Sequence, residues 1–159
     1  MRSAPAPADL EKFRRFLKTG MPGEHAYVVL LGLSAFDYPS IIEQIEKGLP
    51  YPSFERFQKN TGFTSEQLGE LVQVPRRTLA RRKTEGRFST DQSDRLVRAA
   101  RVYGKALHFF GGDPVEATGW LASVRRALGG VTPLDLARTG IGAQEVENLI
   151  GRLEHGVFS

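Results

Sequence analysis

A cluster of basic side chains is the most distinctive chemical feature of this 159-residue sequence. Between positions 75 and 88, six basic residues accompany a single acidic one, and they are Arg76, Arg77, Arg81, Arg82, Lys83 and Arg87. The segment 53–88 holds eight basic and four acidic residues, which accounts for the whole net charge of +4. Such a block in an otherwise neutral chain indicates contact with a polyanion. A solvated helix face would explain the charge alone equally well. The spacing of the residues has to distinguish a polyanion-binding surface from a solvated face.

The spacing from Ser65 onward matches a helix-turn-helix of twenty residues. Its fifth position is Gly69, which lets the second helix cross the first closely. Apolar residues fill the fourth, eighth, tenth and fifteenth positions, and they are Leu68, Val72, Val74 and Leu79. Two positions depart from the pattern: Gln73 replaces the usual turn glycine, and Arg82 stands at the usually apolar eighteenth position.

The second helix of this motif has the composition of a DNA-recognition helix. A rotation of about 100° per residue places Arg77, Thr78, Arg81 and Arg82 on one outward arc, where a recognition helix meets the major groove. Arginine can read guanine or bind phosphate, and the spacing does not distinguish the two. A position near the helix N-terminus favours a phosphate partner for Arg76. The predicted DNA-binding set is Arg76, Arg77, Thr78, Arg81, Arg82 and Lys83; a helix-turn-helix used only for packing is the alternative.

Residues with catalytic or metal-binding potential are sparse. The three histidines, His25, His108 and His155, lie in separate segments, and the chain has no cysteine. Metalloprotease, P-loop and nucleophile-elbow motifs are absent. The glycines at 140 and 142 follow no strand, so they form no dinucleotide fingerprint. We therefore expect no catalysis, no cofactor, no metal and no disulfide.

The elements that position these side chains are all predicted to be helices. Periodicity, capping residues and Gly or Pro breaks place helices at 9–18, 39–47, 52–60, 64–72, 75–84, 90–110, 113–126, 132–137 and 142–154. Thr64 with Gln67 forms a capping-box pattern, and Pro75 suits the first turn of its helix. The apolar segment 25–33 is either a strand or a short buried helix. The predicted fold class is all-α, a helical bundle with a central helix-turn-helix.

Breaks in composition divide the chain into four parts. We expect a disordered Ala/Pro arm at 1–8, a helical region at 9–47, the helix-turn-helix domain at 48–88, and a long helix with a C-terminal helical domain at 89–159. The long helix predicted at 90–110 carries a continuous apolar stripe. This stripe forms either the core of a dimer or part of the intramolecular core. No apolar run approaches the roughly eighteen residues that span a bilayer, so we expect a cytoplasmic protein without membrane contact.

From about Gly48 to its end, the chain resembles the Xre/MbcA/ParS family of antitoxins. The motifs that carry the resemblance are Gly48-Leu49-Pro50, Arg77-Thr78-Leu79 with Arg81-Arg82-Lys83, STDQSDRLVR at 89–98, Phe110-Gly111 with Asp113, Ala117 and Trp120-Leu121, LGGVTPLDL at 128–136, and the segment 142–156. The sequence departs from these family motifs at residues 90–92 and at Leu153, and both departures are mild. The first forty or so residues match only loosely.

The resemblance implies a second function for the C-terminal helical domain, that of binding a toxin. The commonest partner in this family is a RES-domain toxin, an enzyme that destroys NAD⁺. The resemblance implies that the antitoxin blocks the toxin's active-site entrance and that the complex represses its own operon. The expected toxin-binding residues are Leu134, Arg138, Glu147, Arg152, Glu154, His155, Val157 and Phe158.

On operator DNA we expect a homodimer within a larger toxin-antitoxin complex. The alternative is a helix-turn-helix transcriptional regulator whose C-terminal half dimerises or senses a ligand. A tightly bound partner encoded by the adjacent gene would distinguish the two functions.

Overall fold

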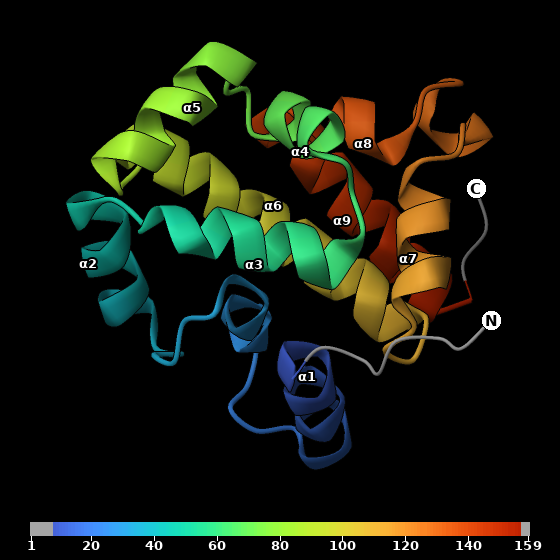
Figure 1. The fold of residues 1–159 in the computed structure, drawn as a ribbon. Helices are drawn as coiled ribbons and strands as arrows, with labels where there is room; N and C mark the ends of the chain where they lie inside the picture. The colour runs from blue at the N-terminus through green and yellow to red at the C-terminus, as the bar shows by residue number, and fades with distance from the viewer. Residues whose placement is uncertain (1–7, 157–159) are drawn as a thin grey trace, which may run out of the picture.

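The computed structural model describes residues 8–156, and these form an all-helical fold (Figure 1). The α-helices are α1 (Ala8–Thr19), α2 (Tyr38–Lys47), α3 (Tyr51–Thr61), α4 (Ser65–Leu71), α5 (Arg76–Glu85), α6 (Thr90–Phe109), α7 (Pro114–Leu121), α8 (Pro133–Leu136) and α9 (Gly140–Glu154), and the 3₁₀ helices are η1 (Ala26–Leu31) and η2 (Arg126–Leu128). The described residues contain two isolated β-bridges and no strand, so the all-α prediction is confirmed. None of the described helices has both the length and the apolar character needed to cross a membrane.

The long helix α6 lies at the centre of the molecule. η1, α2, α3, α7 and α9 all pack against it. Its Tyr103 is fully buried between the rings of Phe57 and Phe63, whose centroids lie 5.9 and 5.6 Å away. Burial raises the pKa of Tyr103 to about 12. The apolar stripe of α6 is therefore intramolecular core, and the alternative that it forms a dimer core is wrong.

The segment predicted as either a strand or a buried helix is the 3₁₀ helix η1. Residues 27–31 are all buried, and this continuous burial explains why periodicity gave no answer. η1 packs closely on α6 at Gly104, where an added Cβ would lie 2.7 Å from the Cβ of Tyr27. The predicted N-terminal arm falls on residues 1–7, outside the described range, and on Ala8, which is the first residue of α1.

The helix predicted at 113–126 ends earlier, at Leu121. The chain then forms a hairpin in which the Arg125 amide donates to the Val131 carbonyl at 3.0 Å. Gly129 and Gly130, at φ +80° and +82°, reverse the chain in a conformation that costs other residues about 1 kcal/mol or more. The predicted helix end was wrong because the hairpin draws Arg125 into an extended conformation.

Candidate functional site

Helices α4 and α5 form the predicted helix-turn-helix. The Thr64 hydroxyl accepts a hydrogen bond from the Gln67 amide, and the Gln67 side chain accepts one from the Thr64 amide, both at 3.0 Å, which confirms the capping box. The four apolar template positions are buried. A Cβ at Gly69 would lie 3.1 Å from the Val74 carbonyl oxygen and 3.4 Å from Leu79 Cδ1. The close crossing of the two helices therefore needs a small residue at this position.

The turn between α4 and α5 is fixed from two other parts of the fold. Gln73 has φ +56°, the left-handed conformation that makes glycine usual at this position. On α6, Arg95 Nε donates to the Val72 carbonyl at 2.7 Å. The Gln73 side-chain amide donates at 2.9 Å to the carbonyl of Arg138, which also accepts from Arg98 Nη2 at 3.3 Å. The turn is thus attached both to the central helix and to the segment between α8 and α9.

Helix α5 presents its basic side chains to solvent. Its N-cap is Pro75, one residue before the helix rather than within its first turn as predicted. Arg76, Arg77, Arg81 and Lys83 are exposed. Arg81 Nε lies 3.4 Å from Glu85 Oε1, and an exposed pair of this kind contributes about 1 kcal/mol or less. The Arg81 guanidinium can therefore exchange this carboxylate for a phosphate or a base edge.

Arg82 does not lie on the outward arc where the sequence placed it. Its side chain is only 20% exposed, and its Nε donates to Gln92 Oε1 on α6 at 2.8 Å. Its Nη1 lies 3.0 Å from Glu85 Oε2. Thr78 is half-buried, whereas Ala80 is exposed, so the outward face of α5 is turned toward Ala80. The placement of Arg82 on the outward arc is corrected: the eighteenth position faces inward because α6 supplies it with a polar partner.

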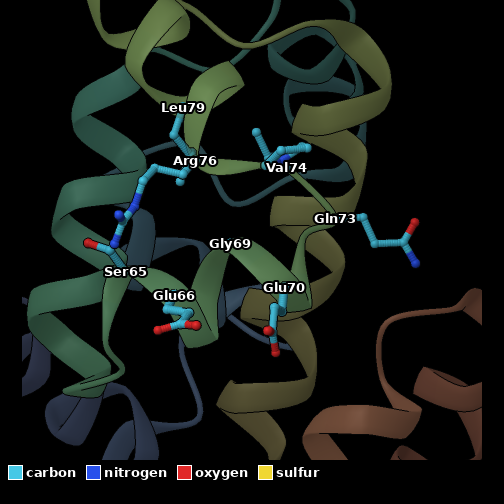
Figure 2. A pocket seen from close by; sticks show the side chains of 9 residues that line it. Ser65, Glu66, Gly69, Glu70, Gln73, Val74, Arg76 and Leu79 are labelled. Atoms are coloured by element: carbon cyan, nitrogen blue, oxygen red, sulfur yellow. The ribbon is translucent and has the colours of Figure 1, made fainter.

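A groove of about 640 Å³ separates α4 from α5. Figure 2 shows the side chain of Arg76 extending toward Ser65 at the start of α4. The exposed carboxylates of Glu66 and Glu70 project from α4 beside the groove. Carboxylates repel phosphate, so the α4 side of the groove is unfavourable for the DNA backbone. The favourable surface is the exposed face of α5 around Arg77 and Arg81.

The expected toxin-binding residues have different environments. Arg138, Glu154 and His155 are exposed, and Leu134 and Arg152 are half-buried. Leu134 packs against the hydrophobic core, and Arg152 Nε is buried without a hydrogen-bond partner among the described residues. Val157 and Phe158 lie outside the described residues.

Glu147, expected to be exposed, is buried. Its side chain is 5% exposed and faces α6, where Arg101 Nε and Nη2 donate to both carboxylate oxygens at 3.0–3.2 Å. Lys105 Nζ lies 3.6 Å from Oε1. The expectation that Glu147 is exposed is wrong, because the packing of α9 on α6 commits this carboxylate to an internal ion pair.

Sequence reasoning did not identify the exposed apolar residues of the C-terminal part. Among the described residues, eight large apolar side chains are exposed, and five of them lie between 109 and 141: Phe109, Val115, Val124, Val131 and Ile141. The indole of Trp120 is half-buried, with the Arg125 guanidinium 5.1 Å from its ring centroid. Val115 lies in the short helix α7, and Val124 and Val131 lie outside the helices, so helical periodicity gave no signal for them.

Comparisons with known proteins agree with this two-part arrangement. Residues 40–101 match the family model of an antitoxin Xre-like helix-turn-helix domain, and residues 105–156 match that of an antitoxin Xre/MbcA/ParS C-terminal toxin-binding domain. A protein of Yersinia enterocolitica named "Antitoxin Xre" is 35% identical over 130 residues, which are 81% of this chain and 88% of that protein. A protein of the same name from Photorhabdus laumondii is 33% identical over the same shares. A third, from Pseudomonas putida, is 31% identical over 84 residues, 52% of each chain.

Proposed function

The chain belongs to the Xre family of antitoxins, and we propose that it neutralises a RES-domain toxin that degrades NAD⁺ and represses its own operon. It is an antitoxin with a helix-turn-helix domain and a toxin-binding domain. The proposed function gives the chain two partners, operator DNA and a toxin. We propose that it binds both in the cytoplasm. The chain acts by binding, and we assign it no catalytic step.

The observation that carries the DNA-binding part is the outward face of α5. Arg77 and Arg81 lie one helical turn apart, are exposed, and stand on a helix whose crossing angle is set by Gly69 and Leu79. Bidentate arginine contacts to a guanine contribute about 1–3 kcal/mol of discrimination each. Arg76 and Lys83 add phosphate contacts, and Thr78, half-buried, borders the same face.

Repression in this proposal requires a homodimer on the operator. A single α5 reads only a few base pairs, and helix-turn-helix proteins gain affinity by placing two such helices about one DNA turn apart. Since α6 is intramolecular core, the dimer contact uses another surface. We place no residue at that contact.

For the toxin-binding part, the exposed end of α9 and the segment before it are the proposed contacts. The residues are Leu134, Arg138, Arg152, Glu154 and His155, continued by Val157 and Phe158. Figure 1 shows α5 and the end of α9 toward different sides of the molecule. The arrangement supports simultaneous binding of operator and toxin, with the toxin's active-site entrance covered.

Co-purification with the protein encoded by the adjacent gene tests this function. We expect a stable complex that shifts a DNA fragment carrying the operon's own promoter and does not shift an unrelated fragment of equal length. A chain that shifts the promoter but retains no protein partner would instead fit a transcriptional regulator with a ligand-sensing C-terminal half.

A further inference from the structure

The outer face of α7 and the chain just beyond it carry apolar side chains that the described residues leave exposed. Val115 on α7 is 79% exposed, and Val124, just beyond its end, is 64% exposed. Full burial of a valine side chain contributes about 1.5–3 kcal/mol relative to leaving it in water. These two valines gain that free energy only when a partner covers them. Both residues lie inside the part matched to a toxin-binding domain, 105–156.

Next to these valines, aromatic and cationic side chains form a continuous row. The rings of Phe109 and Phe110 meet edge to face at 5.0 Å, and the Phe110 ring lies 6.4 Å from that of Trp120. The Arg125 guanidinium carbon lies 5.1 Å from the Trp120 ring centroid. We call Phe110, Val115, Trp120 and Arg125 the α7 ridge. Tryptophan and arginine are the residue types that most often supply the energy of protein interfaces.

The α7 ridge borders a hollow of about 330 Å³. Its lining includes Gly119, where an added Cβ would meet no atom of residues 8–156 within 4 Å. A glycine inside a helix costs about 0.5–1 kcal/mol relative to alanine. No neighbour among the described residues requires the small residue, in contrast to Gly69 and Gly104, so a side chain of a partner can use the open space.

The charges of the α7 ridge indicate which partner groups it accepts. Arg125 Nε is buried and has no hydrogen-bond partner among the described residues, although Nη2 donates to the Trp120 carbonyl at 3.4 Å. Arg126, next to it on the hairpin, is exposed and makes no ion pair within 8–156. The Arg125 Nε atom is closed off by the fold, so the group open to a carboxylate of a partner is the exposed guanidinium of Arg126, while the exposed Glu116 also lines the hollow.

We propose that the α7 ridge is the centre of the toxin interface. An apolar side chain of the toxin enters the hollow over Gly119, and an acidic group beside it pairs with the exposed Arg126. The occupant is the toxin because the ridge lies in the part matched to a toxin-binding domain and offers apolar surface beside the exposed Arg126, with Glu116 also lining the hollow. Figure 1 shows α7 and α5 on opposite sides of the view, so operator DNA leaves this surface free. The inference rests on the proposed function and assigns its anchor residues.

A substitution at Gly119 tests the proposal with little risk to the fold. Gly119→Arg fills the hollow and adds a bulky cation, while its Cβ clashes with nothing. Ile141→Arg is the matched control, because Ile141 is 84% exposed in the same domain but at the start of α9. Val115→Glu is a second variant that adds the charge opposite to that of Gly119→Arg. The measurement is calorimetric affinity for the protein encoded by the adjacent gene, with thermal melting of each variant alone.

We expect Gly119→Arg and Val115→Glu each to weaken binding by about 100-fold or more, with Ile141→Arg within about 3-fold of the parent. Melting temperatures should be unchanged or, for Gly119→Arg, slightly raised. Parental affinity in both α7 variants would overturn the proposal while leaving the antitoxin function intact. Failure of the parent chain itself to bind this protein would instead reject the proposed function.

Discussion

Arg101 and Glu147 should contribute unequally to stability, although they form one ion pair. Replacing Arg101 by alanine leaves a carboxylate that is 5% exposed with only Lys105 nearby, at 3.6 Å. Removing one partner of a buried pair typically costs about 3–5 kcal/mol. For a chain of this size, that loss lowers the melting temperature by roughly 10 °C.

Replacing Glu147 by alanine should cost less. The Arg101 and Lys105 side chains are 42% and 53% exposed, so both cations can turn toward water when the carboxylate is gone. The expected loss is about 1–2 kcal/mol, the value of hydrogen bonds to a partly solvated charge. The double variant should lose less than the sum of the two single variants, because the second change removes a group that the first has already left unpaired.

Urea denaturation of the parent and the three variants measures these differences, and toxin affinity of each variant accompanies it. We expect the affinity of Glu147→Ala to stay within about 3-fold of the parent, since the carboxylate faces α6. Equal losses for the two single variants would refute the asymmetry. Weakened toxin binding in a Glu147→Ala variant of parental stability would refute the internal role of this residue.

Three further predictions concern the operator, alkaline pH and the α8–α9 contact. Arg77→Ala with Arg81→Ala should abolish the promoter shift, at about 1–3 kcal/mol per lost contact, while toxin binding persists; an undiminished shift would exclude α5 as the reading helix. Because burial raises the pKa of Tyr103 to about 12, the folded state requires the neutral phenol, and stability present below pH 10 should fall as the pH rises from 10 to 12. Burial also raises the pKa of the buried Tyr27 and the half-buried Tyr51, so urea midpoints that stay constant over this range would contradict the burial of Tyr103 and Tyr27. A Cβ at Gly142 would overlap the Leu136 carbonyl oxygen, whereas one at Gly151 would meet no described atom within 4 Å. Gly142→Ala should therefore destabilise the fold by several kcal/mol, and Gly151→Ala should be neutral or stabilising by about 0.5–1 kcal/mol. Similar melting temperatures for the two variants would contradict this packing.

Local signals predicted most of the fold. Glycines, prolines and capping residues act over a few positions, and they located α4 and α5 to within a residue or two and identified the need for Gly69. The end of α7 was missed because it depends on a hairpin closed by Val131, ten residues beyond Leu121 along the chain.

The orientation of charged side chains was the least predictable part of the candidate site. Both Arg82 and Glu147 carry charges that favour the surface, yet each meets a partner on α6. The partner of Glu147 lies 46 positions away, a distance over which helical periodicity carries no information. Exposed apolar surface on α7 was likewise invisible, because a valine in a short helix is as often core as interface.

The most direct test of the central claim is the NAD⁺ hydrolysis rate of the purified protein encoded by the adjacent gene, measured with increasing amounts of this chain. We predict rapid NAD⁺ loss by that protein alone and a rate that falls to the uncatalysed level as this chain is titrated to saturation. The Gly119→Arg variant should leave most of the hydrolysis in place at the same concentrations. Hydrolysis that continues unchanged at saturating parent chain would contradict the claim.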